Sequence, residues 1–265
     1  MDPEYADVGG NRIAYRRVGH GPLIVLVHGA VCDGRVWSRQ LLTLADLFTV
    51  VAWDAPGCGE SSDPPESFRL PEYADALAGL IATLGGGEAH VVGHSFGGAL
   101  ALEVARRHPD VVASMTLVGA YAGWAGSLTS DEVQRRLSFA LDVADRLPGG
   151  FDPTSMPGLF TPAMDRAVAD ELAGIMSQIR PAATRAMAHA LAEADLRGSL
   201  ERIDVPVLLL YGDADKRSPL HIAEYLRTHI PGARLVVLSG AGHYLHLEDP
   251  APFEAALRQF LSDVA

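Results

Sequence analysis

The fold is decided by the stretch Ala89-His90-Val91-Val92-Gly93-His94-Ser95-Phe96-Gly97-Gly98. A β-branched run leads into Gly-His-Ser-Phe-Gly, and a helical pattern rich in alanine and leucine follows over 99–107. This order predicts a strand, a sharp turn and a helix, with glycines that let the two backbone segments approach while Ser95 takes a strained conformation. Unpaired N–H groups and the helix dipole favour negative charge where that helix begins. The stretch therefore predicts an exposed serine hydroxyl beside a site suited to an oxyanion.

Composition and charge limit what this serine can belong to. The chain has 265 residues, of which 48% are hydrophobic and 20% charged, as a soluble globular protein requires. Its formal net charge of -12 argues against nucleic acid and anionic membrane as partners, because both select basic surfaces. Residues 1–10 lack an apolar signal core, and no run approaches the roughly 18 apolar residues of a membrane span. Cys32 and Cys58 fall in predicted loops and are expected to be free thiols in a cytoplasmic protein.

Apolar runs alternate with helical patterns along most of the chain. The sequence predicts a hairpin over 4–18 and buried strands at 23–27, 49–53, the run before Ser95, 111–118, 205–211 and 234–238. Helices are predicted at 37–47, 72–84, 99–107, 219–228 and 249–262. This alternation indicates an α/β fold with a mostly parallel, doubly wound, eight-stranded sheet.

The segment 121–204 interrupts this alternation. It shows only helical stretches broken by proline and glycine, so we expect a helical cap inserted into a core formed by 1–120 and 205–265. The candidate pocket residues are Trp124, Phe139, Met156 and Phe160 from this segment and Val31 from the loop after 23–27. The alternative is that the apolar side chains of the cap pack its helices onto one another.

A serine hydroxyl is a weak nucleophile at neutral pH, so Ser95 needs a base, and the base needs an orienting acid. His243 follows the last predicted strand on a Gly-Ala-Gly loop, from which its imidazole can reach the strand ends; His246 is the alternative. For the acid, we favour Asp215 over Asp213, because an aspartate directly after a glycine is typical of a turn whose carboxylate binds its own backbone. The predicted chain order is serine, aspartate, histidine.

The sequence resembles the α/β-hydrolases over its whole length. The motifs that carry the resemblance are His28-Gly29 with Trp37 eight places after the glycine, Asp54-x-Pro-Gly-x-Gly-x-Ser, Gly93-His-Ser-Phe-Gly97, Gly212-x-x-Asp215-x-x-x-Pro219, and Gly242-His243 with Glu248-x-Pro250. The resemblance implies that Ser95 is the nucleophile, that His243 is the general base and later the acid, and that Asp215 orients His243.

The same resemblance implies roles around these three side chains. The oxyanion hole is expected to consist of the backbone N–H groups of Ala30 and Phe96. His28 and Gly29 are expected to shape the loop that carries Ala30, and His94 is expected to pack beside the site.

The resemblance is greatest to esterases, enol-lactonases and cofactor-free haloperoxidases. It implies hydrolysis of a small-to-medium carboxylic ester or lactone through an acyl-enzyme on Ser95, without a cofactor or metal. Haloalkane dehalogenases and epoxide hydrolases carry an aspartate at this position, which disfavours their chemistry here. Two alternatives stay open: a carbon–carbon bond hydrolase of the meta-cleavage type and a non-hydrolytic ligand-binding or biosynthetic homologue. The sequence is compatible with a monomer and with a homo-oligomer.

Overall fold

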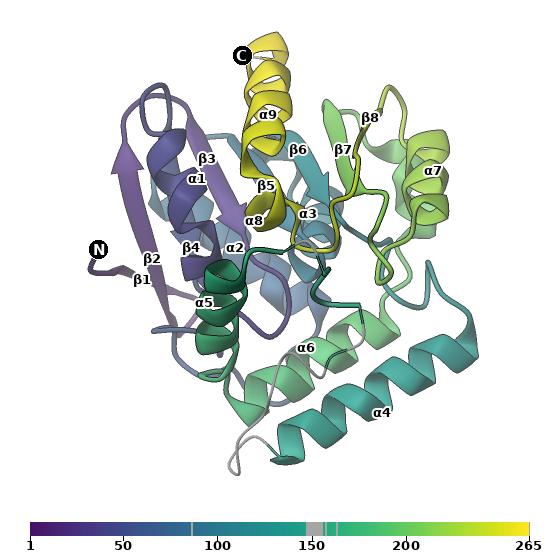
Figure 1. Cartoon of the computed structure of the whole chain (residues 1–265). Helices are drawn as coiled ribbons and strands as arrows, with labels where there is room; N and C mark the ends of the chain where they lie inside the picture. The colour runs from purple at the N-terminus through teal and green to yellow at the C-terminus, as the bar shows by residue number, and fades with distance from the viewer. Residues whose placement is uncertain (86, 147–155, 157, 163, 265) are drawn as a thin grey trace.

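The computed structural model describes residues 1–85, 87–146, 156, 158–162 and 164–264 (Figure 1). Eight strands of the described chain form one sheet in the order β1-β2-β4-β3-β5-β6-β7-β8. Their bounds are β1 (Glu4–Val8), β2 (Asn11–Gly19), β3 (Leu23–Val27), β4 (Thr49–Trp53), β5 (Ala89–His94), β6 (Val112–Val118), β7 (Val207–Gly212) and β8 (Arg234–Leu238). Only β1–β2 and β2–β4 pair antiparallel, and the other neighbours are parallel. The predicted fold class is confirmed.

The hairpin at the edge of the sheet follows from two adjacent glycines. Val8 pairs with Asn11, so Gly9 and Gly10 alone make the turn, and their φ angles are +55° and +84°. Two positive φ angles in a two-residue loop match the right-handed twist of the flanking strands. The hairpin predicted over 4–18 is therefore confirmed.

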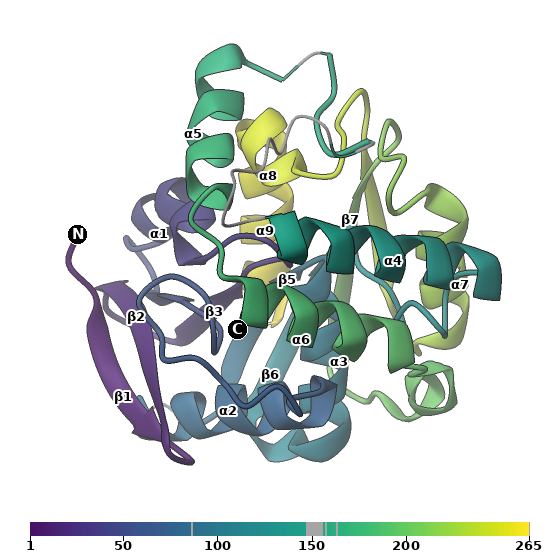
Figure 2. The ribbon, with the colours of Figure 1, turned by 90° about the horizontal axis from the view of Figure 1, so that it is seen from below.

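Helices cover both faces of the sheet, as the alternating side chains of β3 require. Its odd-numbered residues, such as Val25, face a core shared with α2 (Leu70–Thr83), α3 (Phe96–Arg107) and α7 (Leu220–His229). Its even-numbered residues, Ile24 and Leu26, face a core shared with α1 (Ser38–Thr43) and α9 (Pro250–Val264). Because both faces are covered, all five residues of β3 are buried. Figure 2 shows the two helical layers on either side of the strands.

Most predicted boundaries agree with the structure to within three residues, but the helix predicted at 37–47 is wrong in its extent. The chain first forms a 3₁₀ turn, η1 (Gly34–Trp37), and α1 then ends at Thr43. The turn begins early because the Asp33 carboxylate accepts a hydrogen bond of 3.0 Å from the Arg35 N–H. The hydrogen bond of Asp33 therefore sets where the helical turns begin, which the spacing of apolar residues did not predict.

Between β6 and β7 the described residues form helices and no strand. These are α4 (Ser130–Arg146), α5 (Arg166–Met176), α6 (Pro181–Glu193) and the 3₁₀ helix η5 (Arg197–Arg202). Figures 1 and 2 show α4 and α6 side by side across the edge of the sheet toward which the parallel strands point. Residues 147–155, 157 and 163 of the expected cap lie outside the described residues. None of the described helices combines the length and the apolar character that crossing a bilayer would need.

Candidate active site

Ser95 lies in a strained turn between β5 and α3. Its φ is +53°, and Val31 is the only other non-glycine residue of the described chain with a positive φ. The turn is tight because a Cβ added to Gly93 would lie 2.2 Å from the carbonyl oxygen of Gly97. The Ser95 N–H is held by the carbonyl oxygen of Val118 at 2.8 Å. The neighbouring strands therefore maintain a conformation that a side chain-bearing residue seldom adopts.

Asp215 and His243 meet although they follow different strands. Nδ1 of His243 donates to Oδ2 of Asp215 at 2.8 Å, and both residues are buried. An ionised carboxylate can only accept, so this bond places the imidazole proton on Nδ1 and leaves Nε2 as an acceptor. Gly119 makes room for the pair, because a Cβ there would lie 3.2 Å from Oδ2 of Asp215 and 3.3 Å from Nδ1 of His243.

The Asp215 carboxylate is kept ionised by its surroundings. Burial alone raises the pKa of Asp215, but the His243 ring and the N–H groups of Ser218 and Arg217 outweigh it and lower the pKa below its ordinary value. The two N–H groups donate to Oδ1 at 2.9 and 2.8 Å, so Oδ2 is left for the imidazole.

Asp213, the alternative acid, faces another loop. Its carboxylate accepts from the Gly240 N–H at 2.6 Å and from the Ser239 hydroxyl at 3.1 Å. The expectation that it binds its own backbone was wrong, because its carboxylate is bound by the turn after β8. Asp213 therefore fastens the two loops that follow β7 and β8.

His246, the alternative base, lies inside the protein. Its ring stacks on Trp37 at 4.1 Å between centroids, and neither ring nitrogen has a partner among the described residues. Burial lowers the pKa of His246 to about 3, with a smaller contribution from His243. The neutral His246 ring therefore packs in the core.

His94 packs beside the site, as the resemblance implied. Its Nε2 bonds to the carbonyl oxygen of His243 at 2.9 Å, and its ring lies 4.8 Å from the His243 ring. Burial, aided by the nearby His243 and His246, lowers the pKa of His94 well below its ordinary value. His94 is therefore a neutral donor to the backbone of His243.

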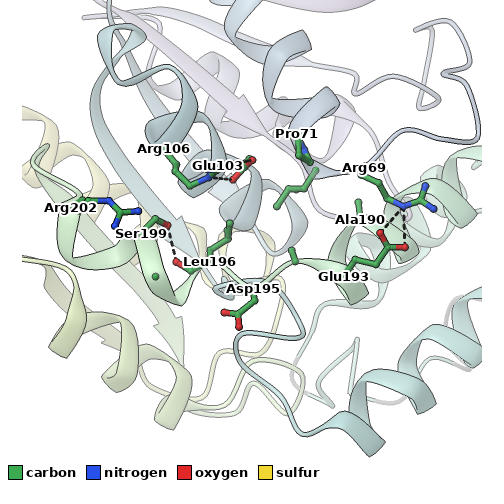
Figure 3. A pocket seen from close by; sticks show the side chains of 13 residues that line it. Arg69, Pro71, Glu103, Arg106, Ala190, Glu193, Asp195, Leu196, Ser199 and Arg202 are labelled. Carbon is green, nitrogen blue, oxygen red and sulfur yellow. Dashed lines mark hydrogen bonds and ion pairs between the residues drawn. The ribbon is translucent and has the colours of Figure 1, made fainter.

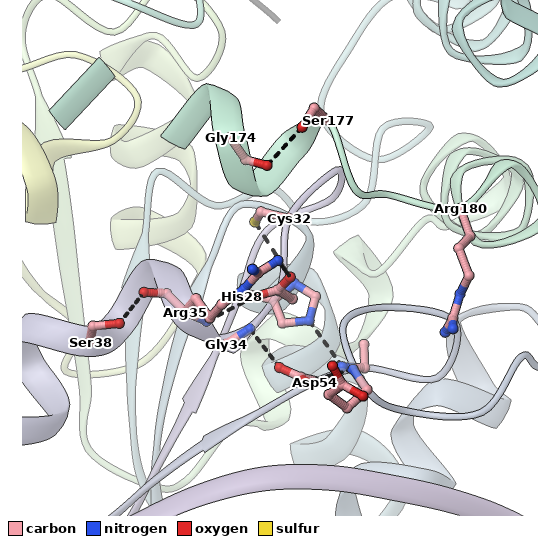
Figure 4. Close-up of polar contacts among 12 residues, drawn as sticks. His28, Cys32, Gly34, Arg35, Ser38, Asp54, Gly174, Ser177 and Arg180 are labelled. Carbon is pink, nitrogen blue, oxygen red and sulfur yellow. Dashed lines mark hydrogen bonds and ion pairs between the residues drawn. The ribbon is translucent and has the colours of Figure 1, made fainter. Parts of the chain in front are cut away.

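The loop after β3 is built around His28. Nδ1 of His28 donates to the carbonyl oxygen of Gly29 at 2.7 Å, and Nε2 accepts from the Ala55 N–H at 3.0 Å (Figure 4). A Cβ on Gly29 would lie 2.8 Å from Nδ1 of His94, so the loop requires glycine there. These contacts bring Ala30 to the pocket that also holds Ser95.

Asp54 fixes the far end of the same loop. Its carboxylate accepts from the N–H of Gly34 at 2.9 Å (Figure 4) and from the N–H of Glu60 at 3.0 Å. Arg16 adds an ion pair of 3.3 Å. Cys32 and Cys58 were expected to be free thiols in loops; both are free, and both are also buried.

Ser95 and His243 line one cavity of about 430 Å³ between the sheet and the segment that joins β6 to β7. Four of the five predicted pocket residues, Val31, Trp124, Phe139 and Met156, line it. Phe160 is absent from the described lining and packs against the apolar cluster that also contains Met156, so its place in the pocket stays a prediction. The Phe96 ring packs against the Tyr73 ring. Phe96 is the first residue of α3, so its backbone N–H has no acceptor within the helix.

Comparison of the sequence with known proteins identifies a family for this chain. A family model described as the alpha/beta hydrolase family matches residues 24–256. The chain belongs to this family. The pimeloyl-[acyl-carrier protein] methyl ester esterase of Chromobacterium violaceum is 34% identical over 94% of this chain and 97% of its own.

Two solved alpha/beta hydrolase structures extend the likeness to the whole fold. An esterase from Thermogutta terrifontis superposes with a TM-score of 0.85 at 26% identity, covering 100% of this chain and 99% of the other. The enol-lactonase of Burkholderia xenovorans superposes with a TM-score of 0.80 at 25% identity, covering 98% and 100%. Membership of this hydrolase family is therefore carried by sequence and structure together.

Several polar residues of the alpha/beta hydrolase pocket were missed from the sequence. They are Tyr121, Glu132, Arg135, Arg136, Lys216 and Arg217. Lys216 and Arg217 directly follow Asp215, and this adjacency was the one signal in the sequence that could have identified them. The others lie in the segment 121–204, whose packing the sequence did not predict.

A second hollow of about 470 Å³ lies on the other side of α6, beside α2 and α3. Four of its charged side chains form two ion pairs: Arg69 with Glu193 at 2.9 Å and Arg106 with Glu103 at 2.6 Å (Figure 3). This hollow is lined by neither Ser95 nor His243. Among the described residues, no cluster of three His, Cys, Asp or Glu side chains is arranged to hold a metal ion.

Proposed function

We propose that this alpha/beta hydrolase cleaves a small-to-medium carboxylic ester or lactone through an acyl-enzyme on Ser95. The observation that carries the proposal is the strained Ser95 turn in the same pocket as His243, whose Nδ1 is bound to Asp215 at 2.8 Å. A serine on such a turn is exposed to substrate, and an oriented imidazole can activate it.

In the proposed reaction, Nε2 of His243 takes the proton of the Ser95 hydroxyl as Oγ attacks the carbonyl carbon. Asp215 holds the imidazole tautomer and stabilises the imidazolium that forms. The N–H groups of Ala30 and Phe96 bind the oxyanion of the tetrahedral intermediate, each worth about 10²- to 10³-fold in rate. Collapse of the intermediate expels the alcohol, which takes its proton from His243. Water then attacks the acyl-enzyme while His243 takes its proton, and the acid leaves as His243 returns that proton to Oγ of Ser95.

The substrate class is supported by the pocket and by the relatives. About half of the described lining residues are apolar, including Trp124, Phe139 and Leu159, and a cavity of about 430 Å³ suits a small acyl group or ring. One relative is named a methyl ester esterase and one structural neighbour an enol-lactonase. In the same proposal, the segment 121–204 acts as the cap that shapes this pocket over the 1–120 and 205–265 core.

The proposal is tested by steady-state hydrolysis of p-nitrophenyl acetate, butyrate and octanoate and of a panel of five- and six-membered lactones. We expect turnover on at least one short ester or lactone by the wild-type chain. The Ser95→Ala variant should lose at least about 10³-fold in kcat, because removal of the nucleophile abolishes the covalent route. Equal activity in the two proteins would overturn the proposal.

A further inference from the structure

The pocket above Ser95 has a charge opposite to that of the chain. The chain carries 33 Asp and Glu against 21 Lys and Arg, a net charge of -12. The described lining nevertheless has four basic side chains, Arg135, Arg136, Lys216 and Arg217, against the single acidic Glu132. A cleft with one sign of charge and apolar walls concentrates ligands of the opposite sign. An electrostatic preference for an anion therefore resides in this pocket although the whole chain is acidic.

The Arg136 guanidinium is bound by other groups of the protein. It lies 2.6 Å from a Glu132 oxygen and donates to the Tyr121 hydroxyl at 2.9 Å and to the carbonyl oxygen of Arg217 at 3.0 Å. The Arg136 side chain is only 13% exposed. These bonds join α4 to the loop that follows Asp215, so Arg136 holds the two walls of the pocket together.

Glu132 is shared between two arginines. One of its oxygens pairs with Arg136 and the other with Arg135, whose side chain is 74% exposed. A single carboxylate neutralises one positive charge, so the trio keeps a net positive charge on the α4 wall. Arg135 is the member whose exposed guanidinium can still turn toward a ligand.

Lys216 supplies a positive charge from the opposite wall. It is exposed, and among the described residues no carboxylate pairs with it. Its stem runs past Gly158, where an added Cβ would lie 3.0 Å from Cβ of Lys216, so the glycine leaves room for the stem. A lysine ammonium in such a place is a compact charge with three donors for a carboxylate.

We infer that the substrate carries a carboxylate in addition to the ester or lactone that reacts, and that Lys216 and Arg135 bind this carboxylate. The inference rests on the proposed function only in that Ser95 attacks the carbonyl group of the ester or lactone. The apolar side chains between the two sites, such as Trp124 and Phe139, would contact the chain or ring that joins the two groups. The substrate class is thus a monoester of a dicarboxylic acid, or a lactone that also carries a free carboxylate.

Matched substrates test this inference through turnover. Monomethyl esters of straight-chain dicarboxylic acids from succinate to adipate are compared with the corresponding neutral dimethyl esters by initial rates. At the best chain length we expect kcat/KM for the monoester to exceed that for the diester by about tenfold, which corresponds to ~1.4 kcal/mol. The Lys216→Gln variant should remove most of this preference, and Arg135→Gln should reduce it by about threefold.

The control variant is Arg166→Gln. Arg166 lies on α5, its side chain is 95% exposed, and it is absent from the pocket lining. It removes the same unit of charge as Lys216→Gln, so the monoester preference should be retained. An equal loss of preference in both variants would show a long-range effect of charge and would overturn the assignment of a site.

A binding measurement separates failure of this inference from failure of the proposed function. Calorimetric titration of Ser95→Ala protein with monomethyl glutarate and dimethyl glutarate needs no turnover. Tighter binding of the monoester that is lost in Ser95→Ala/Lys216→Gln supports the carboxylate site even if no ester is hydrolysed. Equal affinity for the two ligands, or a preference that survives Lys216→Gln, would contradict it.

Discussion

Nε2 of His94 donates a hydrogen bond of 2.9 Å to the carbonyl oxygen of His243. His94 is the residue before Ser95, so the turn of the proposed nucleophile and the backbone of the proposed base are joined directly. The bond is buried, since both residues are at most 2% exposed. The two loops are therefore fixed relative to each other independently of the contact between the Ser95 hydroxyl and the imidazole.

This bond predicts the effect of His94→Phe. The variant keeps a buried ring but leaves the His243 carbonyl without its donor, so the free energy of unfolding should fall by about 1–3 kcal/mol. Displacement of His243 should lower kcat by about 10- to 100-fold. Urea unfolding and ester hydrolysis measure the two effects. His90→Phe is the control, because His90 is also buried but bonds to Ser114 at 2.8 Å, and a similar loss of kcat there would refute the link.

The bond between Asp215 and His243 predicts the effect of Asp215→Asn. An amide cannot hold the Nδ1 proton as a carboxylate does, so kcat should fall by about 10³- to 10⁴-fold with a small change in KM. Asp213→Asn is the matched control, since this carboxylate lies two residues away and binds Gly240 and Ser239. Steady-state kinetics of both variants decide, and a greater loss in Asp213→Asn would exchange the roles of the two aspartates.

The strained turn predicts that Gly93→Ala disrupts the site. The new Cβ would lie 2.2 Å from the carbonyl oxygen of Gly97, so the backbone must move. We expect thermal unfolding at a lower temperature together with a loss of activity. Gly174→Ala serves as the comparison, because its Cβ meets nothing within 4 Å on α5 and should stabilise the protein by about 0.5–1 kcal/mol. An active, stable Gly93→Ala protein would contradict the geometry of the turn.

The buried His246 predicts how stability depends on pH. Its folded pKa of about 3 lies below the ordinary 6.5, so the unfolded chain binds the proton first as the pH falls. The contribution of His246 is therefore complete above pH 6.5 and is lost between pH 6.5 and 3, by about 2 kcal/mol at pH 5.

The matched variant for this prediction is His246→Phe, which keeps a ring against Trp37 and removes the titrating group. Denaturant unfolding at pH 7 and pH 5 should show a smaller loss of stability in the variant than in the wild-type chain. His28 and His94 act with the same sign, because burial also lowers their pKa values, so part of the acid sensitivity should persist. Identical pH dependence in the two proteins would rule out a contribution from His246.

The sheet could be predicted because its strands are local apolar runs bounded by glycine, proline and aspartate. The turn at Ser95 was equally visible, since the strand, the glycines and the helix are adjacent in sequence. The contacts of Asp213 with Ser239 and Gly240 could not be predicted, because they depend on how two distant loops pack.

The charged walls of the pocket show the same limit. Arg136 reaches Tyr121 and the carbonyl oxygen of Arg217, and nothing in the spacing of these three residues indicates that they meet. Phe139 and Phe160 pack against the same apolar cluster, and their aromatic character does not indicate that only Phe139 is part of the described pocket lining. Residues whose roles depend on the packing of 121–204 were therefore the least predictable.

The central claim is that Ser95 becomes acylated, and intact-protein mass spectrometry tests it most directly. The wild-type chain is mixed briefly with p-nitrophenyl acetate or with a fluorophosphonate, quenched in acid and digested for peptide mapping. The account predicts one adduct per chain on the peptide that contains Ser95 and none in Ser95→Ala, while Asp215→Asn forms the adduct far more slowly. Turnover of esters without any adduct on Ser95, or an adduct on another residue, would contradict it.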